Sequence, residues 1–460
     1  MRHPGNRRLR VGIGAAAGTL VLSMSGFAVP AFATAVNQTS GVSPTAVSGT
    51  PSLPTTAGTP YEAVRELQQC GSTMYAVGQF TTITQGGVTY TRNNILSFSA
   101  TAPFTMTSWA PDVNGIVDTI AFDGTNCSDA YIGGNFTTVN GASANHIAEI
   151  DTMTGALVSG FQHNANGEVF TMVVAHDTAG ITHLLTGGAF TSINGSSTKY
   201  YVSLNPSTGA NDGYVNFGIS GTYQYPGVAY EATKVYNQQV SHGGARVMVE
   251  GVFTSVKGQP RQQAFQEWLG PGSASVTGWT APELNDHCVS AEPFYVRAAA
   301  WSPTDSTVYT ASTGDHLFNN PSTPLTGPCD ATIAFSSAES SQNAEWTNYT
   351  GCDSLYAAAA DSYAVYVAGH PRWSDNVNGC NAEGSGAIPD RGLQGLNPGT
   401  GLVETDSQGT AGLYQMSRSN ADDEIITSAG LWIASTNRYD SGMCGGTQGV
   451  SGICFLPYTS

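Results

Sequence analysis

The chain has 460 residues, with 16 Lys and Arg against 33 Asp and Glu, and a formal net charge of −17. Such an acidic surface repels nucleic acid and anionic lipid, so neither is expected as a partner. Charged residues make up only 11% of the chain, which predicts an otherwise uncharged polar surface. Length alone does not decide between one repeat-built domain and two or three ordinary ones.

Residues 1–33 have the pattern of a secretory signal peptide. Four arginines, at positions 2, 7, 8 and 10, precede an apolar run from 11 to 29, and small residues follow up to Ala33. An uncleaved anchor and a twin-arginine signal are the alternatives, although NRRLRV has little of the twin-arginine pattern. No later run reaches the roughly 18 apolar residues of a membrane span. We therefore expect a secreted, extracellular chain that does not insert into a membrane and is monomeric.

Residues 34–58 carry no charge and are rich in Thr, Ser, Pro, Val and Gly. This composition is typical of an extended leader. The regular part of the chain is expected to run from residue 59 to 460.

A short pattern recurs along this regular part, as IGGNFTTVNG from Ile132 and as related runs from Ala76, Thr186 and Val249. The intervals between successive starts are 56, 54 and 63 residues, which indicates a structural repeat. Each copy has a β-prone run, a Gly, Phe-Thr and a Gly-containing turn, the pattern of a strand that ends in a loop. The repeated rings are expected to be buried between neighbouring repeats; they are Phe80, Phe136, Phe190 and Phe253.

Each repeat contains four short β-prone runs and no helical period, which predicts an all-β fold, a seven-bladed β-propeller with four-stranded blades. The fourth run carries an aromatic, such as Trp109, Trp279 or Trp346, and follows an N-P-x-T-G turn in two of the repeats. The last repeat stops after its third strand, near Tyr458. We expect the leader, around residues 51–59, to supply the missing strand and close the ring. Six or eight blades remain alternatives.

The eight cysteines of the exported part predict disulfides, because their number is even and no C-x-x-C pair is present. The blade layout places partners on common faces of the propeller. The expected pairs are Cys288 with Cys329, Cys352 with Cys380, Cys70 with Cys127, and Cys444 with Cys454.

The G-G-x-F-T-x-V-N-G element and the N-P-x-T-G turn resemble the secreted propeller repeats called delta-60 type, which are common in actinobacteria. The resemblance covers Tyr61 to Tyr458 and is strongest in the first blades; the last three lack the signature Phe. It implies a propeller fold and export, and it implies no particular chemistry.

Alignment of the innermost strands predicts a set of side chains at the central channel: Arg65, Asp118, Tyr230, Glu231, Arg297, Tyr356 and Gln415. Charged groups there are costly unless they are paired or hydrated. They would bind a ligand or a cation, or simply pair with one another across the channel.

Other groups of candidate site residues give weaker indications of a functional site. His163, His176 and His183 do not have the spacing of a zinc site, and the acidic run at residues 422–424 is expected to be a solvated hairpin turn without a calcium-loop frame. No nucleophile elbow is present. We therefore expect no metal and no cofactor.

Long insertions are the best place for a ligand, because loops on a rigid scaffold often carry function. Arg372 and Trp373 lie in one of them and would stack on a sugar or grip a protein. The preferred interpretation is a secreted, non-catalytic binding module for a carbohydrate or protein, with its site on the face of the blade crossings. The alternatives are a polysaccharide-acting enzyme that uses Asp118 and Glu231, and a structural envelope protein.

Overall fold

The computed structural model describes residues 38, 40–55, 61–124, 126–222, 231–285, 288, 294–314, 327–351, 353–376, 383–405, 421–437 and 450–459. The expected signal segment, Tyr230 and Gln415 lie outside these ranges. Within them, the one helix is the short 3-10 turn η1 (Pro282–Asn285), and no helix is long and apolar enough to cross a bilayer.

Seven sheets of three or four antiparallel strands make up most of the described chain. In chain order they are sheet 1, β1 (Ala63–Cys70), β2 (Thr73–Gln79) and β5 (Ile95–Ser99); sheet 2, β6 (Ile116–Asp123), β7 (Asn126–Asn135) and β10 (Ile147–Asp151); sheet 3, β11 (Val169–His176), β12 (Thr182–Gly188) and β13 (Tyr201–Leu204); sheet 4, β14 (Lys234–Val240), β15 (Arg246–Val252), β18 (Ala264–Trp268) and β19 (Ser275–Val276); sheet 5, β20 (Val296–Trp301), β21 (Thr307–Ser312), β22 (Ala331–Ser336) and β23 (Ala344–Tyr349); sheet 6, β24 (Leu355–Ala360), β25 (Val365–Gly369) and β28 (Leu393–Leu396); and sheet 7, β29 (Ala421–Thr427), β30 (Gly430–Ser435) and β31 (Ile453–Pro457).

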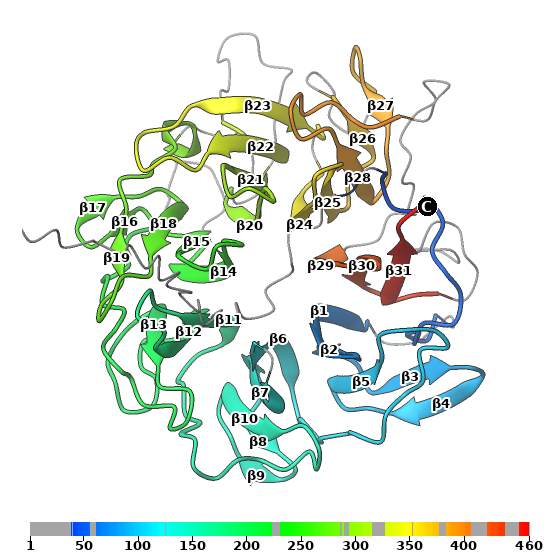
Figure 1. Cartoon of the computed structure of the whole chain (residues 1–460), viewed down its shortest axis with the longest axis vertical. Coiled ribbons are helices and arrows are strands. Elements are labelled where there is room, and N and C mark those ends of the chain that lie inside the picture. The colour runs from blue at the N-terminus through cyan, green and yellow to red at the C-terminus, as the bar shows by residue number, and fades with distance from the viewer. Residues whose placement is uncertain are drawn as a thin grey trace, which may run out of the picture.

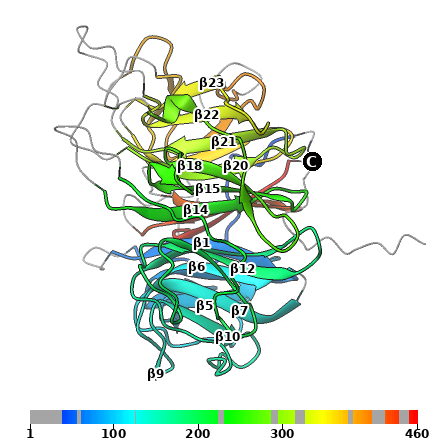
Figure 2. The same ribbon diagram turned by 90° about the vertical axis from the view of Figure 1, so that its left-hand side faces the viewer.

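The sheets lie around a central axis like the blades of a propeller (Figure 1). The first strand of each sheet is innermost and contacts the first strand of the next sheet, in the order β1, β6, β11, β14, β20, β24 and β29. β29 in turn contacts β1, so the first and last sheets are neighbours. The molecule is shortest along this axis, which lies in the plane of the turned view (Figure 2). The expected all-β propeller architecture is confirmed.

Fewer strands pair than the sequence predicts. In the described residues, only sheets 4 and 5 have four strands. In four of the other sheets an isolated bridge stands outside the third strand: Phe98–Met106, Ile150–Leu157, Leu204–Asn211 and Leu396–Val403. In sheet 1, Pro103 and Pro111 flank the bridge. Because proline has no N–H to donate, longer pairing is disfavoured there.

The N-terminal segment runs beside β31, the outer strand of sheet 7. The N–H groups of Ser43, Val47 and Leu53 donate to the carbonyls of Pro457, Phe455 and Ser451, at 2.7, 3.0 and 2.9 Å. The hydrogen-bonded stretch therefore begins earlier in the chain than the expected residues 51–59, of which 56–59 lie outside the described ranges.

The recurrent phenylalanines are buried where neighbouring sheets meet, as expected. All four are at most 1% exposed. Phe136 packs with Val77 and Ile95 of sheet 1, and Phe190 packs with Tyr131 of sheet 2. Burial of such a ring contributes roughly 1.5–3 kcal/mol, which makes these residues part of the scaffold.

Tryptophans of the expected fourth runs also join sheets. The indole N–H groups of Trp109, Trp279 and Trp346 donate to the carbonyls of Asp151, Ser336 and Pro398 in the following sheets, at 3.1, 2.9 and 2.9 Å. Gly401 of the N-P-x-T-G turn lies beneath the ring of Trp346, where an added Cβ would come within 2.3 Å. Only glycine fits this contact.

The turn of the repeated signature closes small two-stranded hairpins between the second and third strands. These are β3 (Thr82–Gln85) with β4 (Val88–Thr91), β8 (Thr138–Val139) with β9 (Ala142–Ser143), and β16 (Ser255–Val256) with β17 (Gln259–Pro260). In sheet 6, which lacks the signature, β26 (Trp373–Ser374) pairs with β27 (Ile388–Pro389). Asn140 and Gly141 have φ of 51° and 77°. Two successive positive φ values are typical of a type I′ turn, which favours Asn-Gly.

Two of the expected disulfides are present. Cys70–Cys127 links the first hairpins of sheets 1 and 2, and Cys288–Cys329 links the entry to sheet 5 with its second-to-third-strand loop. Cys454 is also disulfide-bonded. The expected partners Cys444, Cys352 and Cys380 lie outside the described residues.

Candidate functional site

Every innermost strand contains a β-bulge at the same level, near its first residue. The register skips one residue in each strand, and the skipped residues are Arg65, Asp118, Phe170, Tyr236, Arg297, Tyr356 and Asp422. A bulge re-aims its side chain, and six of these seven line the central cavity; the seventh is Tyr356. We call this set the bulge ring.

In the first four sheets the signature glycine leaves room for the bulge. Gly78, Gly134, Gly188 and Gly251 stand opposite it on the second strand. An added Cβ at Gly134 would lie 2.2 Å from the carbonyl oxygen of Ile116, and the other three would come equally close to the matching carbonyls. The bulged backbone therefore occupies the space of a side chain. Serines stand at these positions in sheets 5 and 7.

One arc of the bulge ring, formed by sheets 7, 1 and 2, is charged: Asp422, Arg65 and Asp118. Burial raises the pKa of Asp118 to about 8, against the attraction of Arg65, and Glu168 raises it further. Burial also raises the pKa of Asp422, opposed by Arg65 and Arg297. Asp118 Oδ2, Asp422 Oδ2 and Arg65 Nε are buried and have no hydrogen-bond partner among the described residues. The three side chains line the cavity, although these particular atoms are themselves buried.

The opposite arc, formed by sheets 3 to 6, is mostly aromatic. The rings of Phe170 and Tyr236 lie 5.1 Å apart, and Tyr295 stacks on Tyr236 at 4.8 Å. The guanidinium carbon of Arg297 lies 4.7 Å from the centre of the Tyr236 ring, a cation–π contact. Burial and then the charge of Glu231 raise the pKa of Tyr236. This arc is a wall of aromatic rings, with the cationic groups of Arg297 and Lys234 against them, and it faces the charged arc.

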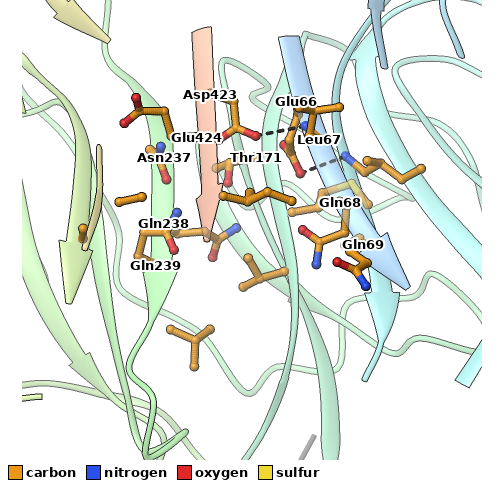
Figure 3. Close-up of a pocket in the computed structure, with 18 of the residues that line it drawn as sticks. Glu66, Leu67, Gln68, Gln69, Thr171, Asn237, Gln238, Gln239, Asp423 and Glu424 are labelled. Carbon is orange, nitrogen blue, oxygen red and sulfur yellow. Dashed lines mark hydrogen bonds between the residues drawn. The ribbon is translucent and has the colours of Figure 1, made fainter. Parts of the chain in front are cut away.

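The cavity that the bulge ring helps to line has a volume of about 480 Å³. In four innermost strands the residue after the bulge lines it too, and these residues form a second layer: Glu66, Thr171, Asn237 and Asp423. Glu66 Oε1 accepts from the Ile120 N–H at 3.3 Å, and Asp423 Oδ2 accepts from the Leu67 N–H at 2.9 Å (Figure 3). Both carboxyls therefore also hold neighbouring sheets together.

Burial, followed by repulsion from Asp423, raises the pKa of Glu66 well above its usual range. Burial also raises the pKa of Asp423, to about 6, although the Leu67 N–H opposes this. The two carboxyls thus do not ionise independently. Gln68, Asn237 and Gln239 line the same cavity, and their side-chain amides make no hydrogen bond within the described part of the chain.

Two of the expected site residues are held in ion pairs near the channel mouth. Lys234 Nζ lies 2.8 Å from Glu231 Oε2. Arg372 donates to both oxygens of Asp353, at 2.7 and 2.9 Å. Trp373, expected in a loop, begins the short strand β26 and is half-buried, with its Nε1 lacking a partner among the described residues.

The structure brings together Arg65, Asp118, Arg297 and Tyr356 as the alignment predicted. It corrects the last acidic run: Asp422, Asp423 and Glu424 lie in β29, the innermost strand of sheet 7, and not in a solvated turn. The alignment missed Phe170 and Tyr236. In sheet 4 it chose Tyr230 and Glu231; Glu231 lies before β14 and not at the bulge, while Tyr230 and the choice for sheet 7, Gln415, lie outside the described residues. The signal that could have found the missed residues is an apolar residue placed before the bulge, as in Val235 before Tyr236.

Buried carboxyls also lie away from the cavity, between sheets 3 and 4. The Tyr201 hydroxyl donates to Glu267 Oε2 at 2.7 Å. Burial raises the pKa of Glu267 to about 8, opposed by this hydrogen bond. Burial also raises the pKa of Glu250 well above its usual range, and neither of its oxygens has a partner among the described residues. These two groups belong to the core between the sheets.

In the residues that the structure describes, no three His, Cys, Asp or Glu side chains are grouped so that they could hold a metal ion.

No protein-family model and no curated protein matches the chain. Solved structures similar to it include the WD40 β-propeller domain of Doa1, at 9% identity over 86% of this chain and 93% of that one, with a TM-score of 0.43. Sqt1 of Saccharomyces cerevisiae is similar at 9% identity over 86% and 96%, with a TM-score of 0.44. The β-propeller domain of Cps50 (Swd1) from Myceliophteria thermophila is similar at 8% identity over 67% and 80%, with a TM-score of 0.36.

Proposed function

We propose that this chain is a secreted, non-catalytic binding protein whose bulge ring binds a carbohydrate. The observation that carries the proposal is the pairing of two arcs across one channel: buried, unpartnered polar atoms of Asp118, Asp422 and Arg65 on one side, and aromatic rings on the other. Sugar hydroxyls would pair with the charged arc, while the apolar faces of the sugar would pack on Phe170 and its neighbours.

The position of the ring favours a small or narrow ligand over a protein. Its residues are half-buried within the channel, and the cavity that six of them line has about 480 Å³, a volume in the range of small-molecule sites. A flat protein surface would not reach them. The disulfides Cys70–Cys127 and Cys288–Cys329 suit the extracellular location of this proposal.

The other two expected functions have less support. Glu231, the expected partner of Asp118 in an enzyme, is held by Lys234, so the described residues give no reason to prefer hydrolysis. A purely structural protein would not need three charged side chains in the wall of a cavity, since burying such groups destabilises the fold.

The proposal includes a finer architecture: seven blades from residue 59 onward, with residues 41–53 as the closing strand beside β31. The backbone hydrogen bonds to Pro457 and Phe455 support it. A chain that starts at Tyr61 should unfold at a clearly lower temperature than one that starts at residue 34. Equal unfolding temperatures would refute the closing role.

The binding test uses isothermal titration calorimetry of the mature protein with neutral tetrasaccharides of glucan, xylan, mannan and N-acetylglucosamine type. We expect saturable binding to at least one, with Kd between about 1 µM and 1 mM. Phe170→Ala and Asp118→Asn should each weaken it at least tenfold.

Trp268→Ala and Asp112→Asn are the matched controls, because both residues are exposed and neither lines the channel. Their affinities should equal that of the unmodified chain. Binding to no member of the panel, or equal binding by ring variants and controls, would contradict the proposal.

A further inference from the structure

The second layer of the cavity differs from the bulge ring in its charge balance. In the bulge ring, Arg65 and Arg297 face Asp118 and Asp422. In the second layer, two of the four residues are carboxyls and none is basic. The two carboxyls, Glu66 and Asp423, come from the neighbouring strands β1 and β29 and so lie on one side of the cavity.

The wall across the cavity from this pair belongs to sheet 4 (Figures 1 and 3). It carries Asn237 and Gln239, whose amides are half-buried and make no hydrogen bond within the described part of the chain. A ligand that extends past the bulge ring would therefore meet acidic oxygens on one side and free amides on the other.

We propose that Glu66 and Asp423 form a subsite for a primary ammonium group, so that the preferred carbohydrate is an amino sugar. This inference rests on the proposed function and specifies its ligand. Hydrogen bonds already orient both carboxyls, from the Thr119 hydroxyl and Ile120 N–H to Glu66 and from the Leu67 and Glu424 N–H groups to Asp423. An ammonium group has three donors, enough for one hydrogen bond to each carboxyl. A charge-assisted hydrogen bond to each carboxyl would offset their mutual repulsion.

Binding should be linked to protonation. The charged groups that face the pair are Arg65 and Asp422 from its own strands, Asp118 from β6, Arg297 from β20, and the buried Glu424. In the free protein, burial and repulsion keep the pKa of Glu66 well above its usual range and that of Asp423 at about 6. A bound cation lowers both pKa values. Binding near pH 6 should therefore release a proton, and affinity should fall at lower pH.

The experiment compares glucosamine tetrasaccharide with its fully N-acetylated counterpart, by calorimetry at pH 6 in two buffers of different ionisation enthalpy. We expect the amine to bind at least tenfold more tightly and to release protons on binding. Glu66→Gln and Asp423→Asn should abolish both the preference and the proton release. Their side-chain amide oxygens can still accept the Ile120 and Leu67 N–H groups, so both variants should fold.

Glu345→Gln is the control, since Glu345 is an exposed carboxyl on an outer strand; it should change nothing. Retained binding of the N-acetylated sugar shows that the variants are folded. Equal affinities for the two sugars, or binding of only a neutral sugar of the panel, would overturn this inference alone, whereas binding of neither these sugars nor any member of the panel would overturn the proposed function as well. Saturable binding of Ca²⁺ that displaces the amine and is lost in Asp423→Asn would replace the ammonium assignment with a metal site.

Discussion

The sequence repeat has different consequences in two regions of the molecule, the interfaces between neighbouring sheets and the bulge ring. At the interfaces the repeat places the same residue type each time, as in Phe136 and Phe190, and each is fully buried. At the bulge ring the repeat places the same backbone distortion each time, but the side chains differ, as in Asp118 and Phe170. Residues that are identical in successive repeats therefore build the scaffold, and residues that differ at the bulge position of each repeat determine the chemistry of the channel.

The sharpest contrast is between two phenylalanines. Phe136→Ala should lower the free energy of unfolding by about 3–5 kcal/mol, because it empties a packed interface between sheets 1 and 2. Phe170→Ala should cost far less, because Phe170 is half-buried at the channel. Urea unfolding of both variants measures this. Equal losses would show that the bulge ring is also scaffold.

Gly134→Ala tests the link between signature and bulge. Its Cβ would lie 2.2 Å from the Ile116 carbonyl oxygen, so we expect a loss of about 3 kcal/mol in the free energy of unfolding. Gly160→Ala is the control, because nothing lies within 4 Å of that Cβ. A loss at Gly134 no larger than at Gly160 would mean that the bulge does not need glycine.

The buried carboxyl of Glu267 should make the free energy of unfolding depend on pH. This effect should not depend on the bulge ring. Its pKa of about 8 lies above the ordinary 4.5, so between these values the unfolded chain loses a proton that the folded chain keeps. Stability should therefore fall as pH rises through this window, by up to about 1.4 kcal/mol per pH unit. Glu267→Gln should flatten the decrease between pH 5 and 7.5 in urea unfolding. An unchanged slope would contradict this, and Glu345→Gln serves as the control.

The smallest expected loss of stability concerns the tryptophan hydrogen bonds that join neighbouring sheets. Trp109→Phe keeps most of the apolar contact and removes only the hydrogen bond to the Asp151 carbonyl at 3.1 Å. We expect a loss of about 1 kcal/mol in the free energy of unfolding, with carbohydrate affinity unchanged. Weakened carbohydrate affinity in Trp109→Phe would show that this interface between sheets influences the bulge ring.

The sequence was sufficient for the parts that repeat. The Gly-x-Phe signature predicted the second strands and the buried rings, and the cysteine layout predicted two disulfides. It was not sufficient for the bulge, because a bulge is a register shift between two strands and becomes evident only when the strands are paired. Asp118 could be aligned within its strand, while Tyr236 was missed.

The carboxyls of the second layer show a further limit. Asp422 and Asp423 follow each other in an acidic run that looks like a solvated turn. Their position in β29 becomes evident only when sheet 7 is placed beside sheet 1, through the hydrogen bond from the Leu67 N–H to Asp423. Charge in a sequence indicates exposure unless the fold supplies partners, and here a strand from the other end of the chain supplies them.

The central claim is that the bulge ring binds carbohydrate on a scaffold that does not depend on it. The most direct test measures sugar affinity and the free energy of unfolding on the same preparation of Phe170→Ala. The account predicts at least a tenfold loss of affinity, with a change in the free energy of unfolding below about 1 kcal/mol. Unchanged affinity for every sugar that the unmodified chain binds would contradict it.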